Sequence, residues 1–227
     1  LAVENFRSLH ERQELSLTAS SLDDKAGSVR RLHGFEHGVL TVAAIYGANA
    51  SGKTNVLRAL AFMDHAVEHS QRSWRPDGPI PFEPFRFAGK SDPSTFEIDF
   101  LIKNVRYRYG FSADGATVLR EWLYAYPSGR RQLWFLREQG VKPLFSFGKQ
   151  LSGENRAIES LTRANSLFLS AAAQNNHEQL LPVYQWFSKG LWFVTDERSA
   201  MPQQTAKLCQ DETFKADVVR LLASADL

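Results

Sequence analysis

The feature that most constrains this chain is the motif Gly47-Ala48-Asn49-Ala50-Ser51-Gly52-Lys53-Thr54, which matches the pattern G-x-x-x-x-G-K-[ST]. An apolar run, residues 39–46, leads into the motif, and its length and β-branched content predict a strand buried on both faces. Apolar residues then recur at helical spacing over residues 51–70. A strand, a glycine-rich loop and a helix in this order predict a phosphate-binding loop and an α/β fold of the P-loop class.

Each residue type in the motif suits a phosphate ligand. Gly47 and Gly52 allow a tight turn that aims successive backbone amides at phosphate oxygens, and the following helix adds the partial positive charge of its N-terminus. Lys53 places a positive charge at the β- and γ-phosphates, and the Thr54 hydroxyl is positioned to ligate Mg²⁺. The sequence therefore predicts a site for ATP and Mg²⁺, with Lys53 as its catalytic residue.

The remaining pattern predicts a β-rich segment and then a helical one. Alternating apolar and aromatic residues over 95–147, interrupted by turn residues, indicate an antiparallel meander of four to five strands. From Gly153 onward the apolar spacing becomes helical again. Shorter expectations are strands at residues 1–6 and 15–18, a polar loop at 20–38, an extended proline-rich connection at 75–84, helices within 157–169, 180–187 and 214–222, and a plain strand or buried segment at 191–194.

Composition narrows the class of protein without naming a partner. The chain has 27 Lys and Arg against 25 Asp and Glu, so its net charge of 27 − 25 = +2 gives no strong field for nucleic acid. The single cysteine, Cys209, excludes an internal disulfide and fits a reducing compartment. Neither a long apolar stretch nor a signal-peptide pattern is present, so we expect a cytoplasmic protein without a membrane partner.

Two stretches together resemble a known family of ATPases. Val3-Glu4-Asn5-Phe6-Arg7-Ser8 comes first, and Ala44-Ile45-Tyr46 with the glycine-rich motif and Asn55 follows a strand later. They resemble the N-terminal lobe of an ABC-type ATPase head, in the branch of chromosome-maintenance, recombination and overcoming-lysogenisation-defect proteins. Within that branch, bacterial abortive-infection ATPases of anti-phage defence look most similar. The resemblance is specific over residues 1–63 and loose elsewhere.

The resemblance implies site residues, partners and a domain plan. Gln174 would ligate Mg²⁺ together with Thr54, a composite site would form in a homodimer or larger homo-oligomer, and nucleotide-driven closure would switch an effector protein. Residues 1–70 would form the nucleotide-binding lobe, 71–150 a β-rich insertion and 151–227 a helical portion, with the C-terminal half of the head expected beyond Leu227. The predicted nucleotide-binding residues are Arg7, Gly47, Asn49, Ala50, Ser51, Gly52, Lys53, Thr54 and Asn55.

Two segments look like further motifs of such a head, and we interpret both as accidental. Residues 151–156 resemble the Leu-Ser-Gly-Gly-Gln signature, but Glu154 replaces the second glycine and would repel a γ-phosphate. Residues 191–197 resemble the strand that ends in a metal-binding Asp and a catalytic Glu, here Asp196 and Glu197. The separation from Ser152, 196 − 152 = 44 residues, is about double the family's, and the expected signature, carboxylates and switch histidine would lie beyond Leu227.

Several alternatives stay open at this point. The head could serve DNA repair or recombination, it could be a non-catalytic scaffold ordered by nucleotide, or the chain could be a small kinase with a P-loop. His65 and His69 have a zinc-compatible spacing but lack a third ligand in register, which favours a solvated helix face. Arg106, Arg108 and Arg130-Arg131 alternate with aromatic residues, which permits nucleic-acid binding but is more typical of a sheet with arginines outside and aromatics inside.

Overall fold

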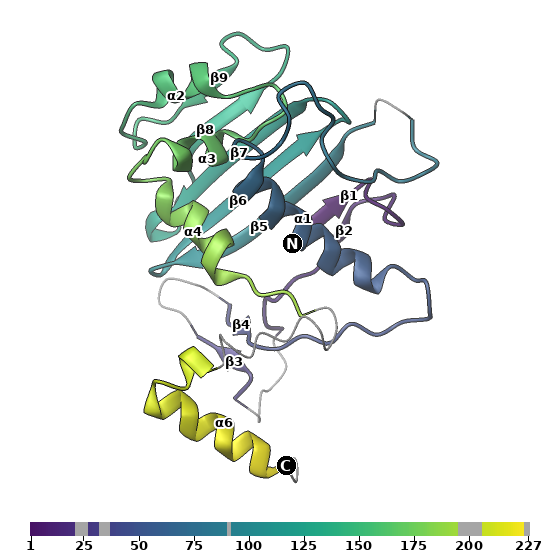
Figure 1. Ribbon diagram of the computed structural model, residues 1–227, viewed down its shortest axis with the longest axis vertical. Coiled ribbons are helices and arrows are strands. Elements are labelled where there is room, and N and C mark those ends of the chain that lie inside the picture. The colour runs from purple at the N-terminus through teal and green to yellow at the C-terminus, as the bar shows by residue number, and fades with distance from the viewer. Residues whose placement is uncertain (21–26, 32–36, 90–91, 195–205, 225–227) are drawn as a thin grey trace. The chain divides into compact units, whose positions relative to one another are not determined.

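The computed structural model describes residues 1–20, 27–31, 37–89, 92–194 and 206–224, which divide between two compact units, Leu1–Leu191 and Trp192–Leu227. Helices, a seven-stranded antiparallel sheet and a two-stranded one make up the described part of the first unit (Figure 1). The elements are β1 (Ala2–Glu4), β2 (Gln13–Glu14), β3 (Val29–Arg30), β4 (Val39–Leu40), α1 (Lys53–His69), β5 (Ser94–Ile102), β6 (Val105–Ala113), β7 (Val118–Tyr126), the 3₁₀ turn η1 (Pro127–Gly129), β8 (Gln132–Glu138), β9 (Phe145–Phe147), α2 (Asn155–Leu161), α3 (Phe168–Gln174), α4 (Leu181–Gly190) and α6 (Glu212–Ser224).

The predicted meander is confirmed as β5 to β9. Each strand pairs antiparallel with the next, and β1 adds to the free edge of β5, which gives a seven-stranded sheet in the order β2-β1-β5-β6-β7-β8-β9. The first strand, the helix after the motif, the extended proline connection and the helices near residues 157–169 and 180–187 are also where the sequence predicted them. Period-two alternation and turn residues were sufficient to predict the meander, because strands that pair within it also follow one another in the sequence.

One face of this sheet, called the inner face, carries the core. Phe62 of α1 packs on Phe96 and Phe111, with ring centroids 5.0 and 6.1 Å away. Phe168 of α3 packs on Phe135 of β8 at 4.9 Å, and similar ring contacts join α4 to the sheet. Figure 1 shows α1, α3 and α4 in front of the sheet. The three helices thus bury the aromatic residues that alternate along β5 to β8.

The opposite face, called the outer face, mixes arginine with aromatic residues. On β6 the sequence prediction is confirmed, because Tyr107 and Tyr109 contact core aromatic rings while Arg106 and Arg108 lie on the outer face. It is wrong for Trp122, which lies opposite Gly110 on the outer face. Gly110 has no side chain, and this leaves room for the Trp122 ring on the outer face. A Cβ on Gly110 would lie only 2.4 Å from that ring.

A buried polar network ties β6, β7 and β8 to α3. The Glu121 carboxylate accepts hydrogen bonds from the Phe168 and Leu169 amides at 2.6 and 3.0 Å and from the Tyr109 hydroxyl at 3.0 Å. Arg137 donates to the carbonyls of residues 163, 164 and 166. Burial raises the pKa of Glu121, and the amide of Leu169 together with the Arg137 charge opposes that shift. The network therefore fixes the start of α3 against the sheet.

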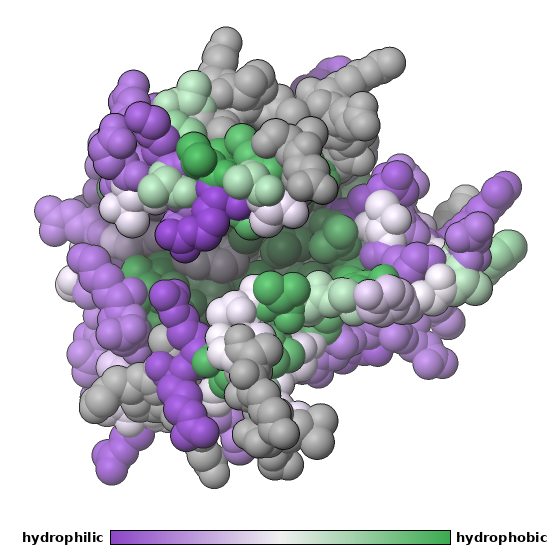
Figure 2. All heavy atoms as spheres, turned by 90° about the horizontal axis from the view of Figure 1, so that it is seen from below, coloured by the Kyte–Doolittle hydropathy of each residue, from purple (hydrophilic) through white to green (hydrophobic). Residues whose placement is uncertain are grey.

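The segment before the motif differs from the prediction. Only Val39 and Leu40 form a strand, β4, which pairs with β3 in a separate two-stranded sheet. Residues 41–48 have no regular element, and the exposed fractions of Val42 and Tyr46 are 75% and 90%. A strand buried on both faces needs neighbours for its backbone groups along its whole length, and among the described residues this run has them only at its start, where β4 pairs with β3 and the Thr41 amide donates to the Ser28 carbonyl at 2.9 Å. Apolar side chains of this run, such as Val42, consequently stay at the surface. Figure 2 shows that apolar side chains (green) are exposed on one face of the protein.

Three shorter expectations are also wrong. The second strand is Gln13–Glu14 rather than residues 15–18, where Thr18 makes only an isolated bridge to Val39. The predicted loop at residues 20–38 contains the short strand β3, because that stretch finds β4 as its partner. Residues 191–194 are neither a strand nor buried, and Trp192 and Val194 are 59% and 75% exposed.

The second unit contains the predicted last helix, observed as α6 (Glu212–Ser224). None of its residues is buried, although its apolar side chains recur at helical spacing. No helix in the described part of either unit combines the length and the apolar character that a membrane crossing requires.

Candidate functional site

The glycine-rich loop leads directly into the N-terminus of α1. Gly52 is the last residue before the helix, and its φ of 95° lies in the left-handed region that a glycine adopts without strain. Ala50 also has a positive φ, 63°, and the Ser51 amide donates to the Ala48 carbonyl at 3.3 Å. These angles turn the chain sharply, and the turn brings the loop backbone next to the first helical amides.

Lys53 lies inside this turn. Its ammonium donates hydrogen bonds to the carbonyls of Gly47 and Ala48, at 2.8 and 2.6 Å from Nζ. The adjacent Thr54 side chain is exposed, as are Asn49 and Ser51 on the loop. The structure thus brings a cation, a hydroxyl and a helix N-terminus together, which is the combination that binds phosphate and, through the hydroxyl, Mg²⁺.

The turn after β1 supports the loop from the side. Asn55 Nδ2 donates to Ser8 Oγ at 2.8 Å, so Asn55 braces the first turn of α1, and its contact with nucleotide stays a prediction. A Cβ on Gly52 would lie 3.0 Å from the same Ser8 oxygen and 3.1 Å from Leu9. Ser8 is therefore a site residue that the sequence analysis did not single out. Its position next to Arg7 in the Asn5-Phe6-Arg7-Ser8 stretch is the signal that could have found it.

Arg7 has a partner of its own. Its guanidinium donates to Glu83 Oε1 at 2.8 Å, and its amide donates to the Glu83 carbonyl. Glu83 belongs to the proline-rich connection, and its side chain is 69% exposed. In this conformation Arg7 fastens that connection to the turn after β1, and its contact with nucleotide stays a prediction.

Gln174 is not brought to the loop. The start of α3 is bonded to the far end of α1, where the Leu167 amide donates to Ser70 Oγ at 3.1 Å and the Gln71 amide to Ser170 Oγ at 3.2 Å. α1 has 17 residues and α3 has 7, so they are about 25 and 10 Å long. Even running straight back, α3 would end more than about 10 Å short of the loop. The metal role of Gln174 remains a prediction.

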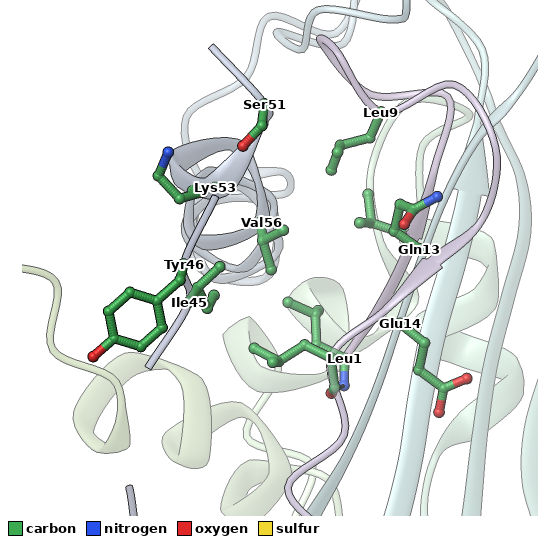
Figure 3. A pocket seen from close by; sticks show the side chains of 12 residues that line it. Leu1, Leu9, Gln13, Glu14, Ile45, Tyr46, Ser51, Lys53 and Val56 are labelled. Carbon is green, nitrogen blue, oxygen red and sulfur yellow. Dashed lines mark hydrogen bonds between the residues drawn. The ribbon is translucent and has the colours of Figure 1, made fainter. Parts of the chain in front are cut away.

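A cavity of about 230 Å³ opens beside the loop. Figure 3 shows Leu1, Ile45 and Val56 pointing into it from three different segments, next to Lys53. Its lining is mainly apolar, with polar side chains at β2 and at the loop. The site therefore combines a phosphate-binding turn with an adjoining apolar space. The lining residues are Leu1, Val3, Leu9, Gln13, Glu14, Leu15, Ile45, Tyr46, Ser51, Gly52, Lys53 and Val56.

The segment that resembles a signature has internal contacts. Ser152 donates to Gln179 Oε1 from its amide at 2.7 Å, and Asn155 Oδ1 lies 3.0 Å from His177 Nε2. Gly153 has a φ of 111°, and a Cβ there would meet the His177 ring at 3.0 Å. These contacts join the start of α2 to the turn between α3 and α4. Asp196 and Glu197, the candidate carboxylates, lie outside the described residues.

The histidine pair on α1 also has local partners. The rings of His65 and His69 are 4.6 Å apart, and His65 Nε2 accepts a hydrogen bond from the Trp74 indole at 3.4 Å. Burial and the neighbouring His69 lower the pKa of His65. Among the residues that the structure describes, no group of three or more His, Cys, Asp or Glu side chains could hold a metal ion.

The comparisons with known proteins place the chain in a family. Residues 42–217 match the model of a family described as "AAA domain, putative AbiEii toxin, Type IV TA system". No curated protein and no solved structure matches the chain. The matched range covers most of the chain and includes the whole glycine-rich loop, α1 and the meander. The chain therefore belongs to this family of AAA domains, which are P-loop NTPase domains that bind nucleotide.

Proposed function

We propose that the chain is the Mg-ATP-binding part of an ABC-type ATPase head that works in a bacterial anti-phage defence system of the abortive-infection kind. The observation that carries the proposal is the loop at the start of α1, where Lys53 lies inside the turn and Thr54 beside it. Membership of a family named for a toxin of a toxin–antitoxin system supports the biological role. A resemblance of residues 3–8 and 44–55 to such heads supports the choice of branch.

The residues around the loop fit the nucleotide that the family implies. Lys53 now bonds to two loop carbonyls, and a phosphate group would replace those neutral partners with charged oxygens. Thr54 would ligate Mg²⁺, which neutralises charge on the phosphate oxygens when it is bound. The apolar cavity beside Lys53 would receive the base, because burial of a flat apolar ring there adds binding free energy.

Lys53 would then serve catalysis as well as binding. Its ammonium would stabilise the negative charge that develops on the transferred phosphoryl group, and Gly52 keeps the helix N-terminus close enough to share that task. Hydrolysis also requires a carboxylate to orient water, and because we interpret the motif at residues 191–197 as accidental, Glu197 is the residue on which that interpretation is tested. In our proposal the complete site forms between two copies of the head, and closure of that dimer switches an effector protein.

A binding experiment tests the loop. We expect Lys53→Ala to lower the affinity of the chain for Mg-ATP at least about tenfold in isothermal titration calorimetry, because a charge-assisted contact is lost. Arg72→Ala is the matched control, since Arg72 is an exposed cation just beyond the other end of α1 and its loss should leave the affinity unchanged. Equal affinities for the wild-type chain and Lys53→Ala would overturn the proposal.

Turnover and assembly separate an ATPase from a nucleotide-ordered scaffold. Phosphate release by the wild-type chain that Glu197→Gln abolishes would assign the catalytic carboxylate to that residue. Light scattering with and without ATP should show dimer formation in the wild-type chain, because in our proposal bound nucleotide closes the dimer. ATP binding without turnover or dimer formation would favour the scaffold.

A further inference from the structure

We propose that the outer face of the meander binds a single-stranded polynucleotide at the end formed by the β5–β6 turn and the β7–β8 turn. This inference does not depend on the proposed ATPase function, because none of its residues contributes to the loop or the cavity. It rests on the placement of three arginines beside two tyrosines on a partly exposed stretch of sheet. The members of this arginine–tyrosine patch are Arg106, Arg108, Tyr124, Tyr126 and Arg131.

The strand register places the patch on one surface. Arg106 is paired with Tyr126 and Arg108 with Tyr124 across β6 and β7, so all four side chains point to the same side. Arg106 lies over the Tyr126 ring at 4.6 Å from its centroid, and Arg131 lies over the Tyr124 ring at 5.1 Å. The helices of the core pack on the other face. The patch is thus a row of guanidinium groups supported by aromatic rings.

The patch has more positive charge than its carboxylates balance. Asp99 is the ion-pair partner of both Arg106 and Arg108, at 2.8 and 2.9 Å, and one carboxylate cannot neutralise two guanidinium groups. Residues 100–113 contain Lys103, Arg106 and Arg108, residues 122–136 contain Arg130 and Arg131, and neither range contains an Asp or Glu. The near-zero net charge of the chain therefore conceals a local excess of cations at this end of the sheet.

A single-stranded polynucleotide suits this surface better than a duplex or an acidic peptide. Antiparallel sheets that bind single strands offer aromatic rings or arginine planes for the bases and cations for the phosphates. A guanidinium above a ring can serve both parts of the ligand, because its plane stacks on a base and its N–H groups donate hydrogen bonds to phosphate oxygens. A duplex hides the faces of its bases, and an acidic peptide has no use for the stacking surfaces. Arg106 and Arg108 are 36% and 35% exposed, so both guanidinium groups reach the surface while part of each bonds to Asp99.

Fluorescence anisotropy with labelled oligothymidine and oligouridine of about 20 nucleotides tests the proposal on the full chain. We expect both to bind, with affinity that falls steeply between about 50 and 200 mM salt. Arg106→Ala/Arg131→Ala should weaken binding at least about tenfold and lower the slope of log K against log salt by about 1.4. Arg75→Ala/Lys142→Ala removes the same charge at exposed sites outside the patch and should leave the affinity within about twofold of the wild-type value.

A second pair of variants separates stacking from charge. Tyr126→Ala keeps every charge and should weaken binding about fivefold or more, whereas Tyr126→Phe keeps the ring and should bind like the wild-type chain. Lys53→Ala should bind the oligonucleotides normally, which keeps this test independent of ATP binding. Circular dichroism melts confirm that each variant is folded.

Four results would overturn the proposal. The first is no binding of either oligonucleotide to the wild-type chain, and the second is equal loss in the patch variant and its control. The third is tighter binding of a blunt duplex of the same length. The fourth is displacement by poly-glutamate combined with normal binding by Tyr126→Ala, which would assign the patch to an acidic polypeptide instead.

Discussion

Two apolar regions of the first unit have opposite fates. Along β5, β6 and β7, aromatic and aliphatic side chains such as Phe96, Phe111 and Leu123 are fully buried. Over residues 39–46 an even more apolar run is mostly exposed, and only its Val39 and Leu40 pair with another described strand. The run lies immediately before the loop that forms the candidate site. The exposed run has the higher fraction of apolar residues, so hydrophobic content does not decide which of the two regions becomes a buried strand.

The difference lies in where the partners come from. Each meander strand finds its neighbour within a few residues of chain, because a turn such as Lys103-Asn104 or η1 folds it back on itself. A central strand of a P-loop fold instead takes neighbours from distant parts of the chain, through crossover connections. Local sequence therefore specifies the meander almost completely. For residues 39–46 it specifies only a preference for extended, strand-like backbone.

The largest expected effect is on the free energy of unfolding, and two alanine variants, one in each region, test the comparison. Phe111→Ala removes a buried ring that contacts Phe62 and Phe96, and we expect it to lower the free energy of unfolding by about 3–5 kcal/mol. Val42→Ala should change it by less than about 0.5 kcal/mol, because Val42 is 75% exposed. Urea unfolding followed by tryptophan fluorescence measures both. A large cost for Val42→Ala would mean that this run is buried in solution and that the contrast is wrong.

The buried network on the meander side gives the next largest effect. Glu121→Ala leaves the amides of Phe168 and Leu169 and the Tyr109 hydroxyl without their acceptor, at an expected cost on the order of 3 kcal/mol. Glu121→Gln keeps one carbonyl oxygen as an acceptor and should cost clearly less in the same urea titration. Equal costs for the two variants would show that one amide oxygen recovers none of these hydrogen bonds, and that the charge or both oxygens of the carboxylate are required.

Much of the fold was predictable, for a physical reason that particular elements show. The alternation of Phe96, Ile98 and Phe100 identified β5, and the helical spacing of apolar residues after the loop identified α1. The outward Trp122 was not predictable, because its position depends on Gly110 of the neighbouring strand leaving room for the ring. Side-chain direction follows from register, and register is a property of two strands together.

The site was predictable to the extent that it is local. Gly52, Lys53 and Thr54 lie where the motif requires, because a loop and the helix that follows it form from adjacent residues. Ser8 and Glu83 were not predicted, because their contacts with Asn55 and Arg7 join residues far apart in sequence. The position of Gln174 depends on how α3 packs at the far end of α1, which no local pattern specifies.

A third prediction concerns the loop itself. Gly52→Ala adds a Cβ at a φ of 95° and within 3.0 Å of Ser8 Oγ, so we expect a stability cost of about 1–2 kcal/mol and weaker ATP binding. Ala50→Gly is the matched control, because its φ of 63° favours glycine and the change should cost less than about 1 kcal/mol. Calorimetric titration with Mg-ATP and thermal melts measure the two effects. Normal affinity in Gly52→Ala would show that the loop tolerates a side chain at this position.

The smallest predicted effect concerns Asp64, a half-buried carboxyl on α1 in the helix layer above the meander. Burial, with a smaller contribution from the Glu68 charge, raises the pKa of Asp64 to about 7 from its usual value of 3.8. One of its oxygens, Oδ1, is buried without a hydrogen-bond partner among the described residues. The folded protein therefore holds the Asp64 proton more tightly than the unfolded chain does.

The raised pKa of Asp64 determines how the stability of the folded protein depends on pH. The stabilisation by protonated Asp64 is complete below pH 4 and is lost as the pH rises through the folded pKa of about 7. His65 acts in the opposite direction, because burial and the neighbouring His69 lower its pKa. The pH dependence of total stability alone would therefore not isolate the contribution of Asp64.

We therefore compare the wild-type chain with Asp64→Asn, in which all other groups are shared. The difference between their unfolding free energies should change by about 1 kcal/mol or less between pH 4 and pH 8, in favour of Asp64→Asn at the higher pH, because solvent screens a half-exposed group. Parallel curves would mean that Asp64 ionises normally, and the helix layer would then be as open to water at this point as residues 39–46 are beside the loop.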